Sequence, residues 1–173
     1  NPITRTWWIS DKEIRNGLAA RTLVIPVTAA RQGALYQAHL HTLGQRYRLL
    51  HRELAQRCDA ALDGSQNLLF FILHDNQGHL LLQDPTPSNL NQQLDDRLPF
   101  QHNWARHHLR SVLLRSELAP SVIDGWMGHE EIGESIFGRH SCLSIQTLQH
   151  VADLIEAHLN FHQIEARAGW QIL

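Results

Sequence analysis

A stripe of apolar residues between Thr28 and Asp63 is the feature that most constrains how this chain can fold. Its members are three or four residues apart, which is the spacing of one narrow side of an α-helix. They are Tyr36, Leu40, Leu43, Tyr47, Leu50, Leu54 and Cys58. Thr28 can cap the start of such a helix. The stripe predicts one long helix over residues 28–63, packed against the rest of the chain or, as the alternative, against another chain.

Two pairs of short apolar runs predict two β-hairpins. The first spans residues 4–27 and turns through Asn16-Gly17, and the second joins residues 68–73 to residues 79–82. Four further helices are predicted, at about residues 89–96 with Ser88 as the cap, 103–117, 121–127 and 144–161. Helices dominate and do not alternate with strands. We therefore expect a mainly α (α+β) fold, in a single domain over residues 1–173.

The amino-acid composition excludes few functions. The formal net charge is −2, and 14 of the 15 basic residues are arginines, Lys12 being the exception. Arginine suits bidentate contacts with phosphate, but a neutral total neither supports nor excludes a nucleic-acid partner. Two cysteines do not make a disulfide framework, and no apolar run reaches the length of a membrane span, so we expect a cytoplasmic protein with free thiols. Because Asn1 opens an apparent strand with no initiator Met, we expect a C-terminal fragment of a longer polypeptide.

The residues that carry the clearest chemistry begin at His107 and Arg110. Three residues apart on a helix, they lie on the same side of it. The guanidinium can donate to two phosphate oxygens, and the imidazole can donate a further hydrogen bond or transfer a proton. A His-x-x-Arg pair alone is common, and an exposed polar helix side is the plainer interpretation.

The segment after Arg110 makes the His-x-x-Arg motif a more specific signal. A short apolar helix ends at Gly128-His129, and the block from His107 to His129 resembles the motif region of the tyrosine recombinase (phage integrase) family. In that family the motif runs His-x-x-Arg, then Leu-Gly-His, then a nucleophilic Tyr about nine residues later. Lys12 in the turn of the first hairpin, followed by the strand 21–26, resembles the family's lysine hairpin. The resemblance implies a recombinase-like helical core that acts in DNA integration and site-specific recombination in a phage or mobile element.

The resemblance also implies a role for each matching residue. Arg110 would clamp the scissile phosphate, and His107 and His129 would donate to its non-bridging oxygens. Lys12 would protonate the leaving 5′ oxygen as general acid. The family's chemistry needs no metal or cofactor. The partner would be duplex DNA, contacted through its phosphates.

Two departures from the family pattern bear on catalysis. The family's arginine upstream of the hairpin is absent from this chain. Phe137 stands eight residues after His129, at the position of the nucleophile, and it has no hydroxyl to attack a phosphate. Serine hydroxyls near that position would require a different mechanism, and Tyr36 and Tyr47 are expected to be packing residues. We expect DNA binding with impaired strand exchange.

Other functions remain open from the sequence. The same fold could be a protein–protein interaction module, or could form a homo-oligomer through the helix at 28–63 or the helix at 144–161. A third alternative is an active phosphodiester enzyme that uses His107 or His129 differently. The spacing of the histidines, among them His158 and His162, matches no common metal motif, so no metal site is expected.

Overall fold

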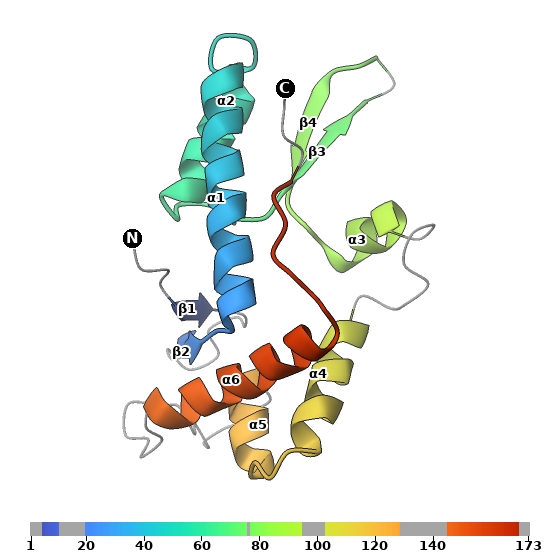
Figure 1. Cartoon of the computed structure of the whole chain (residues 1–173). Helices are drawn as coiled ribbons and strands as arrows, with labels where there is room; N and C mark the ends of the chain where they lie inside the picture. The colour runs from blue at the N-terminus through green and yellow to red at the C-terminus, as the bar shows by residue number, and fades with distance from the viewer. Residues whose placement is uncertain (1–4, 11–19, 76, 95–102, 129–144, 170–173) are drawn as a thin grey trace. The chain divides into compact units, whose positions relative to one another are not determined.

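The structure is a computed structural model that describes residues 5–10, 20–75, 77–94, 103–128 and 145–169. In these residues the chain forms six helices and two antiparallel β-hairpins (Figure 1). The mainly α fold with two hairpins is therefore confirmed. The elements in chain order are β1 (Thr6–Ser10), β2 (Ala20–Val24), α1 (Val27–Tyr47), α2 (Arg52–Leu62), β3 (Phe71–His74), β4 (Leu80–Gln83), α3 (Pro87–Leu94), α4 (Trp104–Leu114), α5 (Pro120–Met127) and α6 (Ile145–Phe161).

The chain gathers into two compact units. Unit 1 comprises residues 1–32 and 104–166, and unit 2 comprises residues 33–103 and 167–173. Helix α1 begins in unit 1 and continues into unit 2. Each unit has its own buried apolar cluster, and each is described by itself below. The single domain over residues 1–173 stays a prediction.

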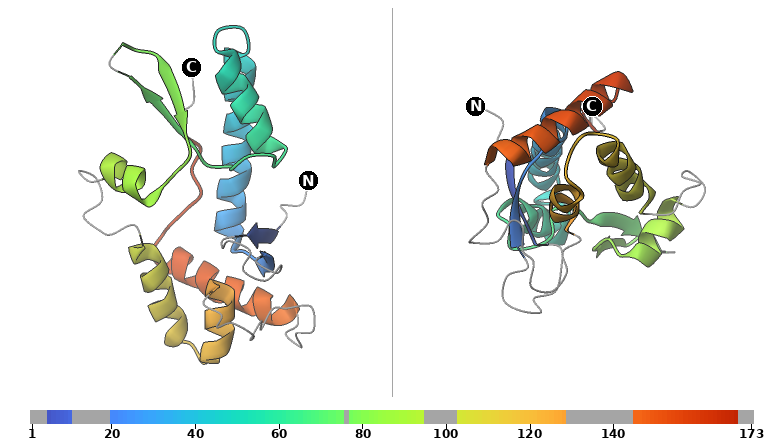
Figure 2. Two further views of the ribbon diagram at one scale, coloured as in Figure 1. Left: turned by 180° about the vertical axis from the view of Figure 1, so that it is seen from behind. Right: turned by 90° about the horizontal axis from the view of Figure 1, so that it is seen from below.

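Unit 1 buries its apolar residues where α6 packs on α4, α5 and β2 (Figures 1 and 2). Its main cluster joins Leu113 of α4, Ile123 of α5, and Val151 and Ile155 of α6. A second cluster packs Leu23 and Val24 of β2 against Leu148 and Ala152 of α6. The predicted first hairpin is confirmed, with Thr6 opposite Val24 and Trp8 opposite Thr22. Burial of one side of α6 explains why the apolar periodicity of this helix is easy to recognise.

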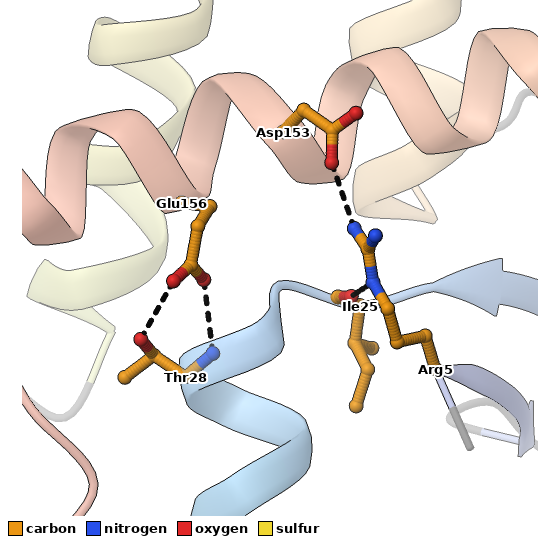
Figure 3. Close-up of polar contacts among 5 residues, drawn as sticks. All are labelled: Arg5, Ile25, Thr28, Asp153 and Glu156. Atoms are coloured by element: carbon orange, nitrogen blue, oxygen red, sulfur yellow. Dashed lines mark hydrogen bonds and ion pairs between the residues drawn. The ribbon is translucent and has the colours of Figure 1, made fainter. Parts of the chain in front are cut away.

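Polar contacts from α6 fix the end of β2 and the start of α1 (Figure 3). The Arg5 guanidinium donates through Nε to the carbonyl of Ile25 at 3.0 Å and through Nη2 to Asp153 at 2.8 Å. The Glu156 carboxylate accepts from the backbone N–H and from the hydroxyl of Thr28, both at 2.9 Å. Thr28 was expected to cap the helix, but α1 already begins at Val27. A carboxylate from α6 therefore accepts a hydrogen bond from an N–H of the first turn that has no partner within the helix, and a negative charge is favourable there.

In unit 2 the apolar stripe does not form one helix, and the prediction of a single helix over residues 28–63 was wrong. Helix α1 ends at Tyr47, and α2 runs back beside it (Figures 1 and 2). Leu40, Leu43, Leu54 and Cys58 are buried in one cluster. A continuous helix of this length would extend about 54 Å and leave the stripe uncovered. Turned back, the two halves of the stripe bury each other, although the sequence contains neither Gly nor Pro at residues 48–51.

Gly44 allows the two helices to approach closely. A Cβ atom at this position would lie 3.2 Å from the Cβ of Cys58, closer than ordinary van der Waals contact. Cys58 is a free, fully buried thiol, and burial raises its pKa. Its prediction as a free thiol is confirmed, and Cys142 lies outside the described residues.

The second hairpin and α3 complete unit 2. Strands β3 and β4 pair antiparallel, with Ile72 opposite Leu82, and this hairpin is confirmed. The expected cap of α3, Ser88, was wrong by two residues. Asn89 accepts from the Thr86 N–H at 2.6 Å, and the Thr86 hydroxyl accepts from the Asn89 N–H at 3.3 Å. This reciprocal pair starts the helix at Pro87, whose missing N–H costs nothing in the first turn.

Candidate functional site

Helix α4 places the candidate residues His107 and Arg110 in unit 1. Leu113 faces the core and is fully buried, which fixes the orientation of the helix about its axis. His107 is exposed and Arg110 is half-buried. The hydroxyl of Ser111 donates to the carbonyl of His107 at 2.9 Å and therefore turns back onto the helix. The sequence placed both candidate residues correctly on one helix.

The Arg110 side chain extends towards α5 and binds Asp124. Its Nε and Nη2 both donate to Oδ1 of that carboxylate, at 3.2 Å and 2.8 Å. About a third of each side chain is exposed, 36% for Arg110 and 32% for Asp124. The carboxylate fixes the plane of the guanidinium but also balances its charge. Among the described residues, the printed donors of Arg110 to Asp124 are Nε and Nη2, and Nη1 makes no hydrogen bond there.

Helix α5 ends beside this pair, and a second arginine of α4 reaches that end. Nη2 of Arg106 donates to the carbonyl of Met127 at 2.6 Å. Gly128 follows with φ 71° and ψ 32°, a left-handed conformation that glycine adopts easily, and its N–H bonds to the carbonyls of Asp124 and Gly125. A positive guanidinium at a helix C-terminus is electrostatically favourable. The predicted end of this short helix at Gly128 is confirmed.

Three of the five predicted site residues fall on parts of the chain that the structure does not describe. Lys12, His129 and Phe137 lie outside the described residues, and so do the hydroxyls of Ser135, Ser141 and Ser144. Only His107 and Arg110 are placed, and their grouping with the other three stays a prediction.

Sequence reasoning missed Asp124 and Arg106, whose side chains link α4 to α5 at this site. Asp124 is the only ionisable residue of α5, while α4 carries two arginines and two histidines. A lone carboxylate beside a basic helix was therefore a signal for the pairing. The choice of Arg110 over Arg106 as its partner depends on how the two helices pack.

The two tyrosines of the chain lie in unit 2. Tyr36 and Tyr47 pack against the buried cluster of α1 and α2, so their prediction as packing residues is confirmed. Burial raises the pKa of the Tyr36 phenol, which makes it a weaker nucleophile at neutral pH.

The apolar sides of the two helices expected to mediate oligomers are mostly used within the chain. The stripe of α1 and α2 forms the cluster of unit 2, and α6 buries Leu148, Val151 and Ile155 in unit 1. Leu49 and Leu50, in the turn between α1 and α2, are 97% and 74% exposed. A homo-oligomer through these helices stays a prediction.

Among the described residues, no helix combines the length and the apolar composition that a membrane span requires. No group of three or more His, Cys, Asp or Glu residues in the described part of the chain is placed to hold a metal ion. Comparison of the chain with models of known protein families, with curated proteins and with solved structures gave no match.

Proposed function

We propose that this chain is a duplex-DNA-binding domain of the tyrosine recombinase type, related to DNA integration, that lacks an attacking hydroxyl of its own. One observation carries the proposal. Arg110, three residues after the exposed His107, is held in a fixed orientation by Asp124 next to the glycine that ends α5. A guanidinium fixed in this way offers Nη1 to a phosphate oxygen without a large loss of side-chain entropy.

The charge of Asp124 sets the expected strength of the contact. Because the carboxylate neutralises part of the Arg110 charge, this site attracts a phosphate more weakly than an unpaired arginine does. Arg106 at the end of α5 adds a second positive charge on the same helix. We propose weak binding through the phosphate backbone, whose affinity depends strongly on salt.

Salt-dependent binding of a short DNA duplex tests this proposal. The Arg110→Gln variant is expected to weaken binding and to reduce the slope of log Kd against log salt concentration by about 0.9, the value of one phosphate contact. Arg52→Gln, at an exposed position on α2, is the matched control and should leave the slope unchanged. The DNA proposal fails if the chain shows no salt-sensitive binding, or if both variants behave alike.

A DNA substrate that traps covalent protein adducts tests the absence of catalysis. We expect no adduct, because Phe137 has no hydroxyl and both tyrosines pack against the buried cluster of unit 2. A trapped adduct that maps to any side chain of the protein would show an active nucleophile and would refute the impaired state. This result would leave the binding proposal intact, so the two parts are tested separately.

A further inference from the structure

On its other side, α4 contributes one histidine to a group of imidazoles that the proposed function does not use. His108, next to His107, faces α6, where it meets His158. The two Nε2 atoms are 3.1 Å apart, and the ring centroids are 5.2 Å apart. His162, one turn after His158, has its ring centroid 4.5 Å from that of His158. Two helices that are distant in sequence therefore bring two ring nitrogens within contact distance.

Two neutral imidazoles whose Nε2 atoms are this close can interact in two ways. One ring can donate its Nε2–H to the Nε2 lone pair of the other, or both lone pairs can point to one cation. Metal–nitrogen bonds to histidine are about 2.0–2.1 Å long. Ligands at a right angle are then about 2.9 Å apart, and ligands at a tetrahedral angle are about 3.3–3.4 Å apart. The observed 3.1 Å lies between these values, so a metal ion fits with little movement of either ring.

We propose that His108 and His158 form a surface site for a divalent transition-metal ion such as Zn²⁺, bound through both Nε2 atoms. Imidazole nitrogens suit zinc, nickel and copper ions and disfavour magnesium and calcium. The His108 ring is exposed and that of His158 is half-buried, so an ion reaches both from solvent. Since no third His, Cys, Asp or Glu of the described residues completes a metal-binding group, water fills the remaining positions. The ion would join α4 to α6.

The surroundings favour neutral ligands but oppose an added positive charge. Burial lowers the pKa of His158, and the nearby His162, His108 and Arg115 lower it further. In the hydrogen-bonded pair one ring carries its proton on Nε2, and binding requires this proton to move to Nδ1. Arg115 repels a divalent cation at this site, so the affinity of the native protein is limited.

Titration of the full chain with Zn²⁺ alone at pH 7.5, followed by calorimetry, tests the site. Replacement of either ligand, as His108→Gln or His158→Gln, should lower the zinc affinity on the order of tenfold or more, because one ligand remains. His150→Gln, at an exposed position on the same helix α6, is the matched control and should bind zinc like the native protein. Equal affinity of all three variants would overturn the proposal.

Two further variants distinguish the proposed pair from a neighbouring pair of histidines and from the effects of misfolding. His162→Gln separates the proposed pair from a pair formed by His158 and His162 along α6. If His162→Gln loses zinc binding and His108→Gln keeps it, the proposed pair is wrong. Arg115→Gln should raise the zinc affinity by roughly twofold to fivefold, a gain that a misfolded protein would not show.

Acid provides an independent readout of the same site. Lowering the pH from 7.5 to 5.5 should weaken zinc binding in the native protein, because protonated imidazoles do not ligate a metal. Binding that persists unchanged at pH 5.5 would point to ligands other than histidine and would overturn the proposal.

Discussion

The two sides of α4 hold their neighbouring helices by different physical means. Towards α5, Arg110 and Asp124 carry opposite charges, and the contact is an ion pair. Towards α6, His108 and His158 are identical groups, and their contact requires at least one neutral ring. One helix thus has an ion pair on one side and, on the other, a contact between imidazoles that is conditional on their protonation. The second is the contact on which protons and, under the proposal above, metal ions would act.

The largest expected effect comes from the residue that supports both sides. Leu113 lies on α4 between α5 and α6 and is fully buried. We expect Leu113→Ala to lower the free energy of unfolding by about 2–5 kcal/mol, because the cavity loosens both helix contacts. Urea denaturation measures the change. Leu114→Ala, at the adjacent position with 45% exposure, is the control and should cost much less. Similar losses in the two variants would contradict the assignment of Leu113 to the core.

The charged side of α4 should show a smaller coupling. In a double-mutant cycle of Arg110→Met and Asp124→Asn, we expect a coupling free energy of about 0.5–1 kcal/mol, since both groups are partly screened by solvent. The pair formed by Arg48 and Asp59 in unit 2 is more exposed, at 51% and 56%, and provides the comparison. Its coupling should be near zero at the same ionic strength. If the exposed pair couples more strongly, the orientation of Arg110 by Asp124 contributes no stability.

The histidine side should show the smallest effect at neutral pH and a dependence on acid. The folded-state pKa of His158 is below its ordinary value, so the unfolded chain binds more protons. Stability should be unaffected by this group above about pH 7, and should fall as the pH drops through 6.5 towards the folded-state pKa. The His158→Gln variant should lose part of this fall between pH 7 and pH 5, whereas His150→Gln should retain it. Thermal denaturation at a series of pH values provides the comparison. An identical pH dependence in both variants would exclude the conditional contact.

Local chemistry explains which elements could be predicted from the sequence. The hairpins, the end of α5 at Gly128 and the apolar side of α6 follow from turn residues, backbone freedom and periodicity within a few residues. The break between α1 and α2 could not be predicted, because spacing by three and four residues continues through the turn. The position of the break depends on the packing of α2 against α1, which buries the apolar stripe and which Gly44 permits.

In the candidate site, too, local features were predictable from the sequence and contacts between helices were not. The helix that carries His107 and Arg110 was predictable from the spacing of its apolar residues. The partners of that helix were not, because Asp124 and His158 reach it only through the packing of three helices. The adjacent residues His107 and His108 have different surroundings in the structure. Both are exposed, but only His108 contacts a histidine of α6 among the described residues.

The carboxylate that serves the first turn of α1 also has a consequence for synthesis of the chain. Glu156 follows Thr28 by 128 residues, so at about 5–20 residues per second the ribosome adds it roughly 6 to 26 s later. The residues that bury the unit 2 cluster all precede it. Unit 2 can therefore begin to fold on the nascent chain while the start of α1 still lacks its acceptor. Unit 1, built from residues 1–32 and 104–166, must wait for α6 to emerge.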